Sequence, residues 1–469
     1  MTNNPQSISL PNSWKRKPLK DLGQWCGGGT PSKAKPQYWE NGTVPWVSPK
    51  DMKQDRIADS EDHITEVAVT ESTTNLVPAG SVLVVTRSGI LRHTLPVAVA
   101  GVPVTVNQDL KVLTPRLDVL PEYVAWGLRA FSQDILHTCS KQGTTVNSIE
   151  TQKLLAYEIP IAPPDQQKLI VADIEKQFSR LDEGVANLKR VKANLKRYQA
   201  AVLKAAVEGK LTEEWRKAHP DVEPGSELLK RILTERWAKW NAKGKYKEPT
   251  TPNITNFPPL PRGWTLTSVS QLLTEPLCNG ISVKGSNTPP GIRALRLSAM
   301  SDAGFDYSDV RYLPLSEDDV QDLWIVEGDF FMSRGNGSLH LVGRGTSAQQ
   351  PSDPTIFPDT MIRLRLAKYL RESGWLRTIW SSRVVRSQIE RKVKTTAGIY
   401  KIAQPEVEQI TIPLPPLLEQ ERIVTEVERR FSVITEVEAQ MSTNLQRAER
   451  LRQTILQHAF TGQSDRNFC

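Results

Sequence analysis

Two segments of this chain, about 250 residues apart, repeat one another, and this repeat constrains the fold more than any other feature. Ile159 to Phe178 (IPIAPPDQQKLIVADIEKQF) aligns with Ile412 to Phe431 (IPLPPLLEQERIVTEVERRF) over twenty positions without a gap. The same register continues to Gly209, which falls on Gly462. Solenoid repeats are only about 20 to 50 residues long, so this one is a duplicated domain with its helix. The chain therefore contains two copies of one module.

Fainter matches precede both segments in the same order. They are Leu10, Pro11, Trp14, Ser48, Val77–Gly80, Arg87–Gly89 and Asp109 in the first copy, and Leu260, Pro261, Trp264, Ser298, Val326–Gly328, Arg334–Gly337 and Asp359 in the second. Each copy is therefore a globule followed by a helix. A duplicated module suggests a target with two-fold character.

Apolar residues recur every seven positions along each repeated helix. The rows are Ile174, Leu181, Leu188, Leu195 and Val202 in the first helix, and Val427, Ile434, Met441, Ala448 and Ile455 in the second. Ile170, Val191, Tyr198 and Ala205 supply a second row in the first helix. A seven-residue spacing over four heptads is the seam of a left-handed coiled coil. Each helix is expected to run about 44 residues, or roughly 66 Å at 1.5 Å per residue.

A helix of this length with one apolar stripe must bury that stripe against a partner of similar length. The other copy in the same chain is such a partner. Because each helix follows its own globule, antiparallel pairing would send the globules to opposite ends. Parallel pairing in a homodimer is the alternative. Pro163–Pro164 and Pro415–Pro416 mark the helix entries, and Gly209 and Gly462 stand where C-terminal caps are expected.

The first globule mixes short β-branched runs with turns and one helical stretch. Segments 80–87 and 95–106 predict strands, and 121–136 predicts a helix. The fold class is therefore α/β or α+β, with two globules joined by an antiparallel coiled coil and an internal pseudo-two-fold repeat. The expected boundaries are 1–160 for the first globule, 161–210 for the central helix, 211–257 for a connector, 258–413 for the second globule, 414–463 for the C-terminal helix and 464–469 for a tail.

The connector is expected to hold a short helix over 226–241, starting at the N-cap Ser226, followed by a loop rich in Pro, Thr and Asn. Its tryptophans, Trp215, Trp237 and Trp240, are expected to pack onto neighbouring helices.

Composition indicates an ordinary soluble protein, with 38% hydrophobic and 24% charged residues. The N-terminus has no leader pattern and no run of 18 apolar residues occurs, so we expect a cytoplasmic protein without a membrane partner. The four cysteines are far apart and the six histidines are dispersed, which disfavours both disulfides and a metal site.

Catalytic motifs are missing as well. The chain has no Asn-Pro-Pro-aromatic motif of base methylation and no phosphate-binding GxxxxGK[ST] loop. Gly27–Gly28–Gly29–Thr30 is the nearest glycine-rich stretch, and a lone glycine run is more often a flexible turn. Catalysis by this chain, and a cofactor of its own, are therefore disfavoured.

The net charge of +8 and the pI near 9.2 are compatible with binding a polyanion. Eleven Lys or Arg stand against two Glu between Met361 and Lys401, so the positive charge is concentrated in the second copy. The stretch 369–391 looks helical, and a solvated helix face is the alternative explanation of this charge.

Taken together, these motifs resemble the specificity subunit of type I restriction-modification enzymes. The resemblance spans almost the whole chain. It depends on two variable globules, each followed by a proline-rich helix entry with glutamine (Gln166 and Gln167 in the first, Gln420 in the second). It depends also on the helix ends AVLKAAVEGKLT (201–212) and TILQHAFTGQ (454–463). The weaker globule motifs are 44–51, 143–145 and 394–396.

The resemblance implies that each globule is a target recognition domain reading one half of a bipartite, asymmetric site in double-stranded DNA. The paired helices would fix the gap between the halves. They would also dock two modification subunits, which use S-adenosylmethionine to methylate adenine. Two restriction subunits would add ATP- and Mg-dependent translocation and cleavage, as a restriction system in phage defence. The chain itself would be non-catalytic.

Within that framework, polar loops after a strand are candidate base readers, because Arg and Asn make paired hydrogen bonds to guanine and adenine. These candidates are Arg87, Ser88 and Arg92 in the first copy and Arg334, Asn336, Ser338 and His340 in the second. Candidate phosphate contacts are Lys50, Lys141, Thr144, Thr145, Arg293, Arg296, Lys394, Thr395 and Thr396. Asp109 and Asp359 are expected to hold loops. The alternatives are a self-sufficient DNA methyltransferase or nuclease, and a coiled-coil scaffold that does not bind DNA.

Overall fold

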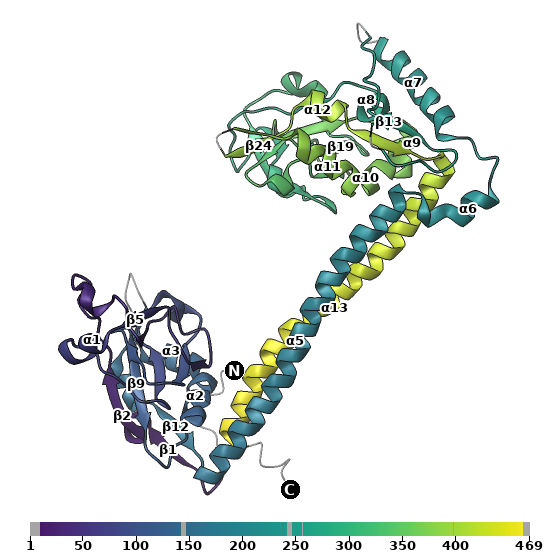
Figure 1. Cartoon of the computed structure of the whole chain (residues 1–469). Helices are drawn as coiled ribbons and strands as arrows, with labels where there is room; N and C mark the ends of the chain where they lie inside the picture. The colour runs from purple at the N-terminus through teal and green to yellow at the C-terminus, as the bar shows by residue number, and fades with distance from the viewer. Residues whose placement is uncertain (1–9, 142–146, 242–245, 256, 397, 463–469) are drawn as a thin grey trace. The chain divides into compact units, whose positions relative to one another are not determined.

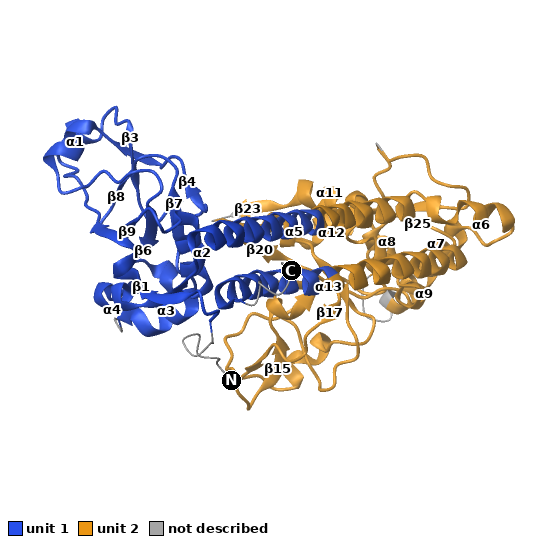
Figure 2. Cartoon of the chain, turned by 90° about the horizontal axis from the view of Figure 1, so that it is seen from below, with its two compact units in different colours: residues 1–189, 441–469 blue, residues 190–440 orange. Residues whose placement is uncertain are grey.

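The computed structural model describes residues 10–141, 147–241, 246–255, 257–396 and 398–462 (Figure 1). The chain divides into two compact units (Figure 2). Unit 1 comprises residues 1–189 and 441–469, and unit 2 comprises residues 190–440. Each unit therefore holds one globule, one end of the first long helix and one end of the second.

Unit 1 is built on a five-stranded sheet in the order β2-β9-β6-β7-β4, antiparallel except where β4 pairs with β7. Helix α2 packs against β6 and β7. A smaller sheet, β5-β3-β8, and two strand pairs, β1-β12 and β10-β11, complete the globule. The strands are β1 (Lys15–Pro18), β2 (Gly23–Gly27), β3 (Val44–Val47), β4 (Arg56–Ile57), β5 (Asp62–Ile64), β6 (Val82–Val85), β7 (Val97–Ala100), β8 (Thr105–Val106), β9 (Leu110–Pro115), β10 (Ser140–Lys141), β11 (Ser148–Ile149) and β12 (Glu158–Ile161). The helices are α1 (Glu66–Glu71), α2 (Pro121–Ala130), α3 (Ser132–Cys139) and α4 (Thr151–Ala156), with the 3-10 turns η2 (Leu19–Leu22), η3 (Pro36–Tyr38) and η4 (Gly89–Arg92).

The globule of unit 2 contains a four-stranded sheet, β14-β22-β19-β21, and a three-stranded sheet, β20-β24-β23. The strands are β13 (Thr265–Ser268), β14 (Cys278–Asn279), β15 (Ile292–Leu295), β16 (Met300–Ser301), β17 (Gly304–Phe305), β18 (Val310–Leu313), β19 (Phe330–Ser333), β20 (Gly335–Asn336), β21 (Gly345–Ser347), β22 (Met361–Leu364), β23 (Lys394–Thr396), β24 (Ile399–Lys401) and β25 (Thr411–Leu414). The helices are α8 (Val269–Leu272), α9 (Lys368–Ser373), α10 (Trp375–Ile379), α11 (Arg383–Lys392) and α12 (Gln404–Glu408), with the 3-10 turns η6 (Leu297–Ala299), η7 (Asp318–Leu323) and η8 (Leu339–Leu341).

The internal repeat is visible in the strand pairing. In unit 1, β1 pairs with β12 directly before the long helix α5 (Pro164–Val207), and in unit 2, β13 pairs with β25 directly before α13 (Leu417–Thr461). Lys15 lies opposite Ile161, and Thr265 lies opposite Leu414. In both copies, the first strand of the globule therefore pairs with the strand that leads directly into the long helix.

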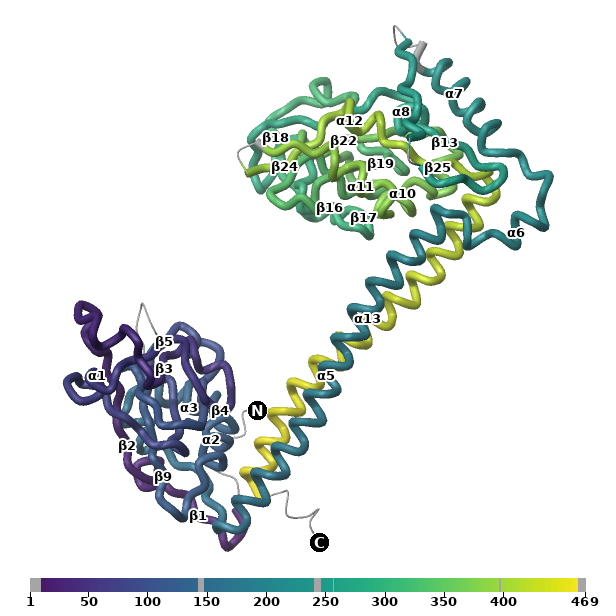
Figure 3. The backbone as a smooth tube through the Cα atoms, viewed as in Figure 1, coloured from purple at the N-terminus to yellow at the C-terminus, as the bar shows by residue number. Residues whose placement is uncertain are grey.

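The two long helices run antiparallel in both units (Figure 3). In unit 1 the start of α5 shares a core with the end of α13, through Ile174 and Phe178 on one helix and Leu456 and Phe460 on the other. In unit 2 the end of α5 shares a core with the start of α13. The helices have 44 and 45 residues, close to the predicted length. Gly209 and Gly462, with φ of 66° and 70°, follow their ends in the left-handed conformation expected of a cap.

The predicted seam is buried or half-buried throughout. Ile174, Val202, Val427, Ile434, Met441 and Ala448 are buried, and Leu181, Leu188, Leu195 and Ile455 are half-buried. The second row was wrong at two positions, because Val191 and Tyr198 are 43% and 45% exposed. A narrow two-helix seam leaves such flanking positions at its edge.

Three sequence predictions need correction. The stretch 121–136 is two helices, α2 and α3, which break at Phe131. The stretch 369–391 is three helices, because Gly374 takes a left-handed φ of 68° and Ser382 is extended. The stretch 95–106 contributes β7 and β8 to different sheets.

The connector holds η5 (Lys210–Thr212), α6 (Glu213–Ala218) and α7 (Gly225–Asn241). Helix α7 was predicted and α6 was missed, and the predicted N-cap Ser226 was wrong because it lies inside α7. The expectation for its tryptophans was wrong at Trp237, which is 55% exposed. Trp215 stacks on His219, with ring centroids 4.5 Å apart. The side chain of Trp240 lies outside the described residues. Arg236 anchors α7 instead, since it is 2% exposed and donates from Nη1 to the Leu273 carbonyl at 2.9 Å.

Candidate nucleic-acid interface

In unit 1 the candidate base readers Arg87 and Ser88 follow β6, whose four residues are all buried. Ser148 forms an antiparallel bridge with Arg87 and also pairs with Lys141 in the β10-β11 ladder. Arg87 and Lys141 are 54 positions apart in the sequence, and the fold pairs both of them with Ser148. Thr144 and Thr145 lie outside the described residues.

Asp109 holds the Arg87 loop. Its Oδ1 lies 2.5 Å from Arg87 Nε, and its Oδ2 accepts from Asn107 Nδ2 at 3.2 Å. Its backbone carbonyl accepts from the amides of Thr86 and Arg87. The expectation that this carboxylate orders a loop agrees with these contacts. The Arg87 side chain is still 54% exposed, so its remaining donors face solvent.

Ser88 and Arg92 frame the short turn η4. Ser88 Oγ accepts from the Ile90 amide at 3.4 Å as the N-cap of the turn, and Arg92 is exposed at its end. Ser88 therefore has a local structural contact within the turn.

In unit 2 the sheet β20-β24-β23 joins the two candidate segments. Asn336 pairs with Tyr400, and Tyr400 pairs with Thr395. Arg334, just before β20, is fixed through its backbone, which donates to the Thr360 carbonyl at 2.7 Å and accepts from the Ile402 amide at 3.0 Å. Segments 334–336 and 394–396, which are far apart in the sequence, thus form one surface.

The two units place one lysine equivalently, while their arginines differ by one position in the strand pairing. The register that aligns Ile159 with Ile412 also aligns Lys141 with Lys394, and Ser148 with Lys401. Ser148 bridges to Arg87 in unit 1, while Lys401 pairs with Gly335, next to Arg334, in unit 2. In both globules, a loop that carries an arginine (Arg87 or Arg334, the arginine loop) therefore lies near a strand that carries a lysine (Lys141 or Lys394, the lysine strand).

The remaining residues of the second loop have local partners. Asn336 Oδ1 accepts from the Ser338 amide at 3.1 Å. His340 is exposed, and its carbonyl accepts from Arg386 Nη2 at 3.4 Å. The Arg334 guanidinium reaches the carbonyl of Asp359 at 3.5 Å, so here the backbone of Asp359 holds the loop. Lys394, 81% exposed, pairs with Glu406 at 3.2 Å. The side chain of Thr396 is outside the described part of the chain.

Three candidate phosphate contacts lie elsewhere and are already paired. Lys50 Nζ lies 2.9 Å from Asp62 and 3.2 Å from Glu61. Arg293 pairs with Asp353 and donates to the Tyr307 carbonyl at 2.5 Å. The third residue, Arg296, pairs with Asp309 at 3.1 Å and donates to Asn287 at 2.6 Å. DNA would have to compete with these carboxylates, as it would with Asp109 for Arg87 and with Glu406 for Lys394.

The basic stretch 361–401 is not a uniform surface. Arg363 is 4% exposed and donates to the Asp322 carbonyl at 2.9 Å, and burial lowers its pKa. Arg365 donates to the buried Asp329 through Nε and Nη2, both at 2.8 Å, and this hydrogen bonding raises its pKa. Part of the charge that the sequence concentrates here therefore stabilises the interior of the globule.

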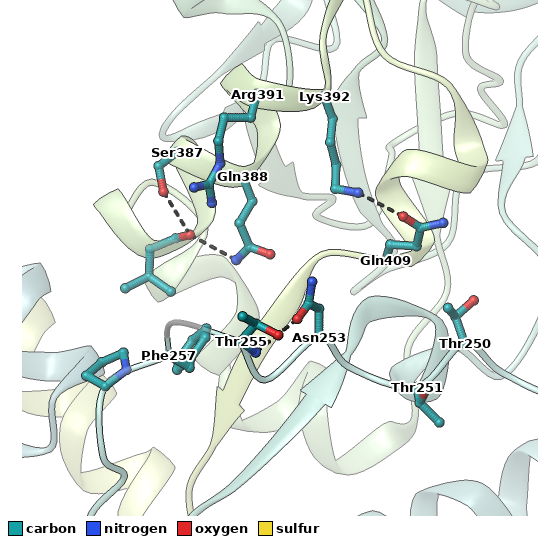
Figure 4. Close-up of a pocket in the computed structure, with 12 residues that line it drawn as sticks. Thr250, Thr251, Asn253, Thr255, Phe257, Ser387, Gln388, Arg391, Lys392 and Gln409 are labelled. Atoms are coloured by element: carbon teal, nitrogen blue, oxygen red, sulfur yellow. Dashed lines mark hydrogen bonds between the residues drawn. The ribbon is translucent and has the colours of Figure 1, made fainter.

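A cavity of about 660 Å³ lies between α11 and the connector segment that precedes β13 (Figure 4). Its lining includes Thr250, Asn253, Gln388, Arg391 and Lys392. Gln388 is fixed there, because its amide exchanges two hydrogen bonds of 2.8 Å with the backbone of Thr411. None of the candidate DNA-binding residues lines this cavity.

Sequence analysis missed the anchors at the helix entries. In unit 1, Trp14 Nε1 donates to Gln166 Oε1 at 2.8 Å. In unit 2, Trp264 Nε1 donates to Glu419 Oε2 at 2.9 Å, and Glu419 also accepts from Arg216 and Thr212. The matched tryptophans and the alignment of Gln166 with Glu419 were the available signal.

Among the described residues, no cluster of three His, Cys, Asp or Glu side chains is placed to hold a metal ion. No helix within the same ranges is long and apolar enough to cross a membrane.

Comparison with known proteins agrees with this architecture. A family profile described as the type I restriction modification DNA specificity domain matches residues 11–197. The EcoKI specificity subunit of Escherichia coli K12 is 30% identical over 322 residues, covering 68% of this chain and 61% of the relative. The chain belongs to the family of type I restriction-modification specificity subunits.

Other relatives and solved structures point the same way. The EcoR124I/EcoR124II specificity subunit of Escherichia coli is 44% identical over 160 residues, which cover 34% of this chain and 40% of the relative. The chain therefore spans less than two thirds of either relative. A chain from a structural study of complex assembly and conformational transition of the type I R-M system has a TM-score of 0.65 at 16% identity, covering 96% of this chain and 98% of that one. The HsdS subunit of Thermoanaerobacter tengcongensis has a TM-score of 0.50, also at 16% identity, and covers 98% and 100%. These structures share the fold.

Proposed function

We propose that this chain is the DNA-reading subunit of a type I restriction-modification complex and recognises a bipartite, asymmetric site. The observation that carries the proposal is the duplicated surface, in which an arginine loop lies beside a lysine strand in each globule. Arginine and asparagine form paired hydrogen bonds with base edges in the major groove, whereas lysine and threonine bind phosphates. One globule would read each half-site.

The antiparallel helices supply the spacing between the half-sites. Half-sites read from one face of B-DNA are about 34 Å apart or a multiple of it. A paired helix of 44 residues is roughly 66 Å long at 1.5 Å per residue, which is the right scale for such a spacer. Helix length would set the gap, and the loops would set the bases.

The same subunit would also assemble the complex. We propose two modification subunits, carrying S-adenosylmethionine, and two restriction subunits, using ATP and Mg, as partners in the cytoplasm. The chemistry would be theirs, and this chain would be the non-catalytic subunit of an adenine-specific methyltransferase and ATP-dependent endonuclease. This division is supported by family membership and by the catalytic motifs that the sequence lacks.

A DNA-binding measurement at several salt concentrations tests the proposal. The chain assembled with modification subunits is expected to bind its mapped sequence with an affinity that falls linearly in a log–log plot against salt, because phosphate contacts release counterions. A coiled-coil scaffold would retain no DNA even at low salt. A self-sufficient enzyme would methylate or cut DNA without the other subunits. Either result would refute the proposal.

A further inference from the structure

Two short turns, each preceded by a serine, stand beside the candidate base readers. The turn η4 follows Ser88 in unit 1, and η8 follows Ser338 in unit 2. Each turn exposes one large apolar side chain: Ile90 is 44% exposed and Leu339 is 37% exposed. Single exposed apolar residues are common on protein surfaces, so exposure alone decides nothing.

Both turns are braced from behind by a side chain at equivalent positions. In unit 1, Gln133 on α3 donates from Nε2 to the His93 carbonyl at 3.3 Å. In unit 2, Arg386 on α11 donates from Nη1 to the Val342 carbonyl at 2.7 Å. The register of the internal repeat aligns Gln133 with Arg386.

Further contacts fix the position of each turn. Trp380, 2% exposed, donates from Nε1 to the Gly343 carbonyl at 2.8 Å behind η8. Leu91, the neighbour of Ile90, is 3% exposed and belongs to the core of unit 1. These contacts tie each turn to its globule, and a precise contact requires side chains held in position.

The chemistry of DNA restricts what an aliphatic side chain can read. Arg87 and Arg334 suit polar base edges, whereas the apolar group that the major groove presents is the C5 methyl of thymine. An aliphatic side chain one turn away from an arginine could contact such a methyl group in the same half-site.

We propose that Ile90 and Leu339 are specificity-determining residues, each of which contacts a thymine methyl in the half-site read by its own globule. The assignment rests on the proposed function. It predicts that replacing Ile90 changes recognition of the first half-site only, and that replacing Leu339 changes recognition of the second half-site only.

The test replaces thymine by deoxyuridine, which lacks only the methyl group. The recognition sequence is first mapped from methylated adenines in cells carrying the chain and its modification subunits. Duplexes with each thymine replaced in turn are then bound to the assembled complex, and Kd is measured by fluorescence anisotropy. The variants are Ile90→Ala and Leu339→Ala, with Val67→Ala (Val67 is 45% exposed) and Val326→Ala (43%) as controls.

For the complex that contains the wild-type chain, we expect deoxyuridine at one position of each half-site to raise Kd about fourfold. This change is about 0.8 kcal/mol at 1.4 kcal/mol per tenfold. Ile90→Ala should bind thymine and deoxyuridine equally at that position in the first half-site, and Leu339→Ala should do so in the second. The control variants should keep the fourfold difference.

Three results would overturn the assignment. The first is that the wild-type complex binds all thymine and deoxyuridine duplexes with the same Kd, and the second is that the effect of deoxyuridine on Kd persists in both alanine variants. The third result is that the control variants lose the effect of deoxyuridine as the alanine variants do. A complex with no preference for the mapped sequence over random DNA would instead refute the proposed function itself.

Discussion

The buried contact between Arg216 and Glu419 offers a quantitative test of how the connector locks the two helix ends in unit 2. Glu419 is fully buried and accepts from Arg216 Nη1 at 2.7 Å, from Thr212 Oγ1 at 2.7 Å and from Trp264 Nε1 at 2.9 Å. Arg216 also donates to the carbonyl of Gly209, at the end of α5, from Nη1 at 3.1 Å and Nη2 at 2.6 Å.

Arg216→Met leaves the Glu419 carboxylate buried without its cation. Breaking a buried ion pair from one side costs about 3–5 kcal/mol, and we expect the lower end, about 3 kcal/mol, because Arg216 is 16% exposed and water can enter. Unit 1 provides the comparison, since Gln166 occupies the place of Glu419 and accepts from Trp14. Adding Glu419→Gln should therefore recover most of the loss.

The assay is urea unfolding followed by tryptophan fluorescence for the two single variants and the double variant. A residual loss of about 1 kcal/mol is expected in the double variant, because the hydrogen bonds to Gly209 stay absent. The coupling between the two sites should then be about 2 kcal/mol or more. Single-variant losses that add to within about 0.5 kcal/mol in the double variant would refute the reasoning.

Three further predictions concern base reading, packing and backbone conformation. Arg334→Ala should relax the second half-site in methylation mapping, while co-purification of the modification subunits stays intact; an unchanged second half-site would count against the assignment. Phe460→Ala, which removes a fully buried ring from the core of unit 1, should lower the free energy of unfolding by about 3–5 kcal/mol in urea titration, and a loss below about 1 kcal/mol would contradict the packing. Gly209→Ala should cost more than about 1–2 kcal/mol, because φ is 66° there and the added carbon would lie 2.6 Å from Pro261 Cγ. Gly184→Ala, where nothing lies within 4 Å of the added carbon, should raise the free energy of unfolding by about 0.5–1 kcal/mol. Equal effects of Gly209→Ala and Gly184→Ala on the free energy of unfolding would contradict this explanation.

The long helices could be predicted because their signal is local and repeated. The seven-residue row from Ile174 to Val202 sets the period, and Gly209 marks the end. The short helices of the second globule could not be predicted as separate elements, because their breaks depend on two backbone conformations, at Gly374 and Ser382, within an otherwise helical pattern.

The candidate interface was predicted in part. Arg87 and Arg334 were recognisable as polar loops after strands, but their proximity to Lys141 and Lys394 depends on strand pairing, which a single sequence does not specify. Buried charges were the least predictable feature. Arg236 looks like any surface residue of an amphipathic helix, and its burial follows from tertiary contacts with Leu273.

The gap between the two half-sites tests the central claim most directly. Residues 185–191 of α5 and 438–444 of α13 occupy equivalent positions in the repeat register, and deleting both segments removes one heptad from each helix while keeping the seam in phase. Seven residues correspond to about 10.5 Å of helix, or about three base pairs. Methylation mapping of this variant should return the same bases in each half-site with a shorter gap. Recovery of the original gap, or of altered bases with an unchanged gap, would contradict the account.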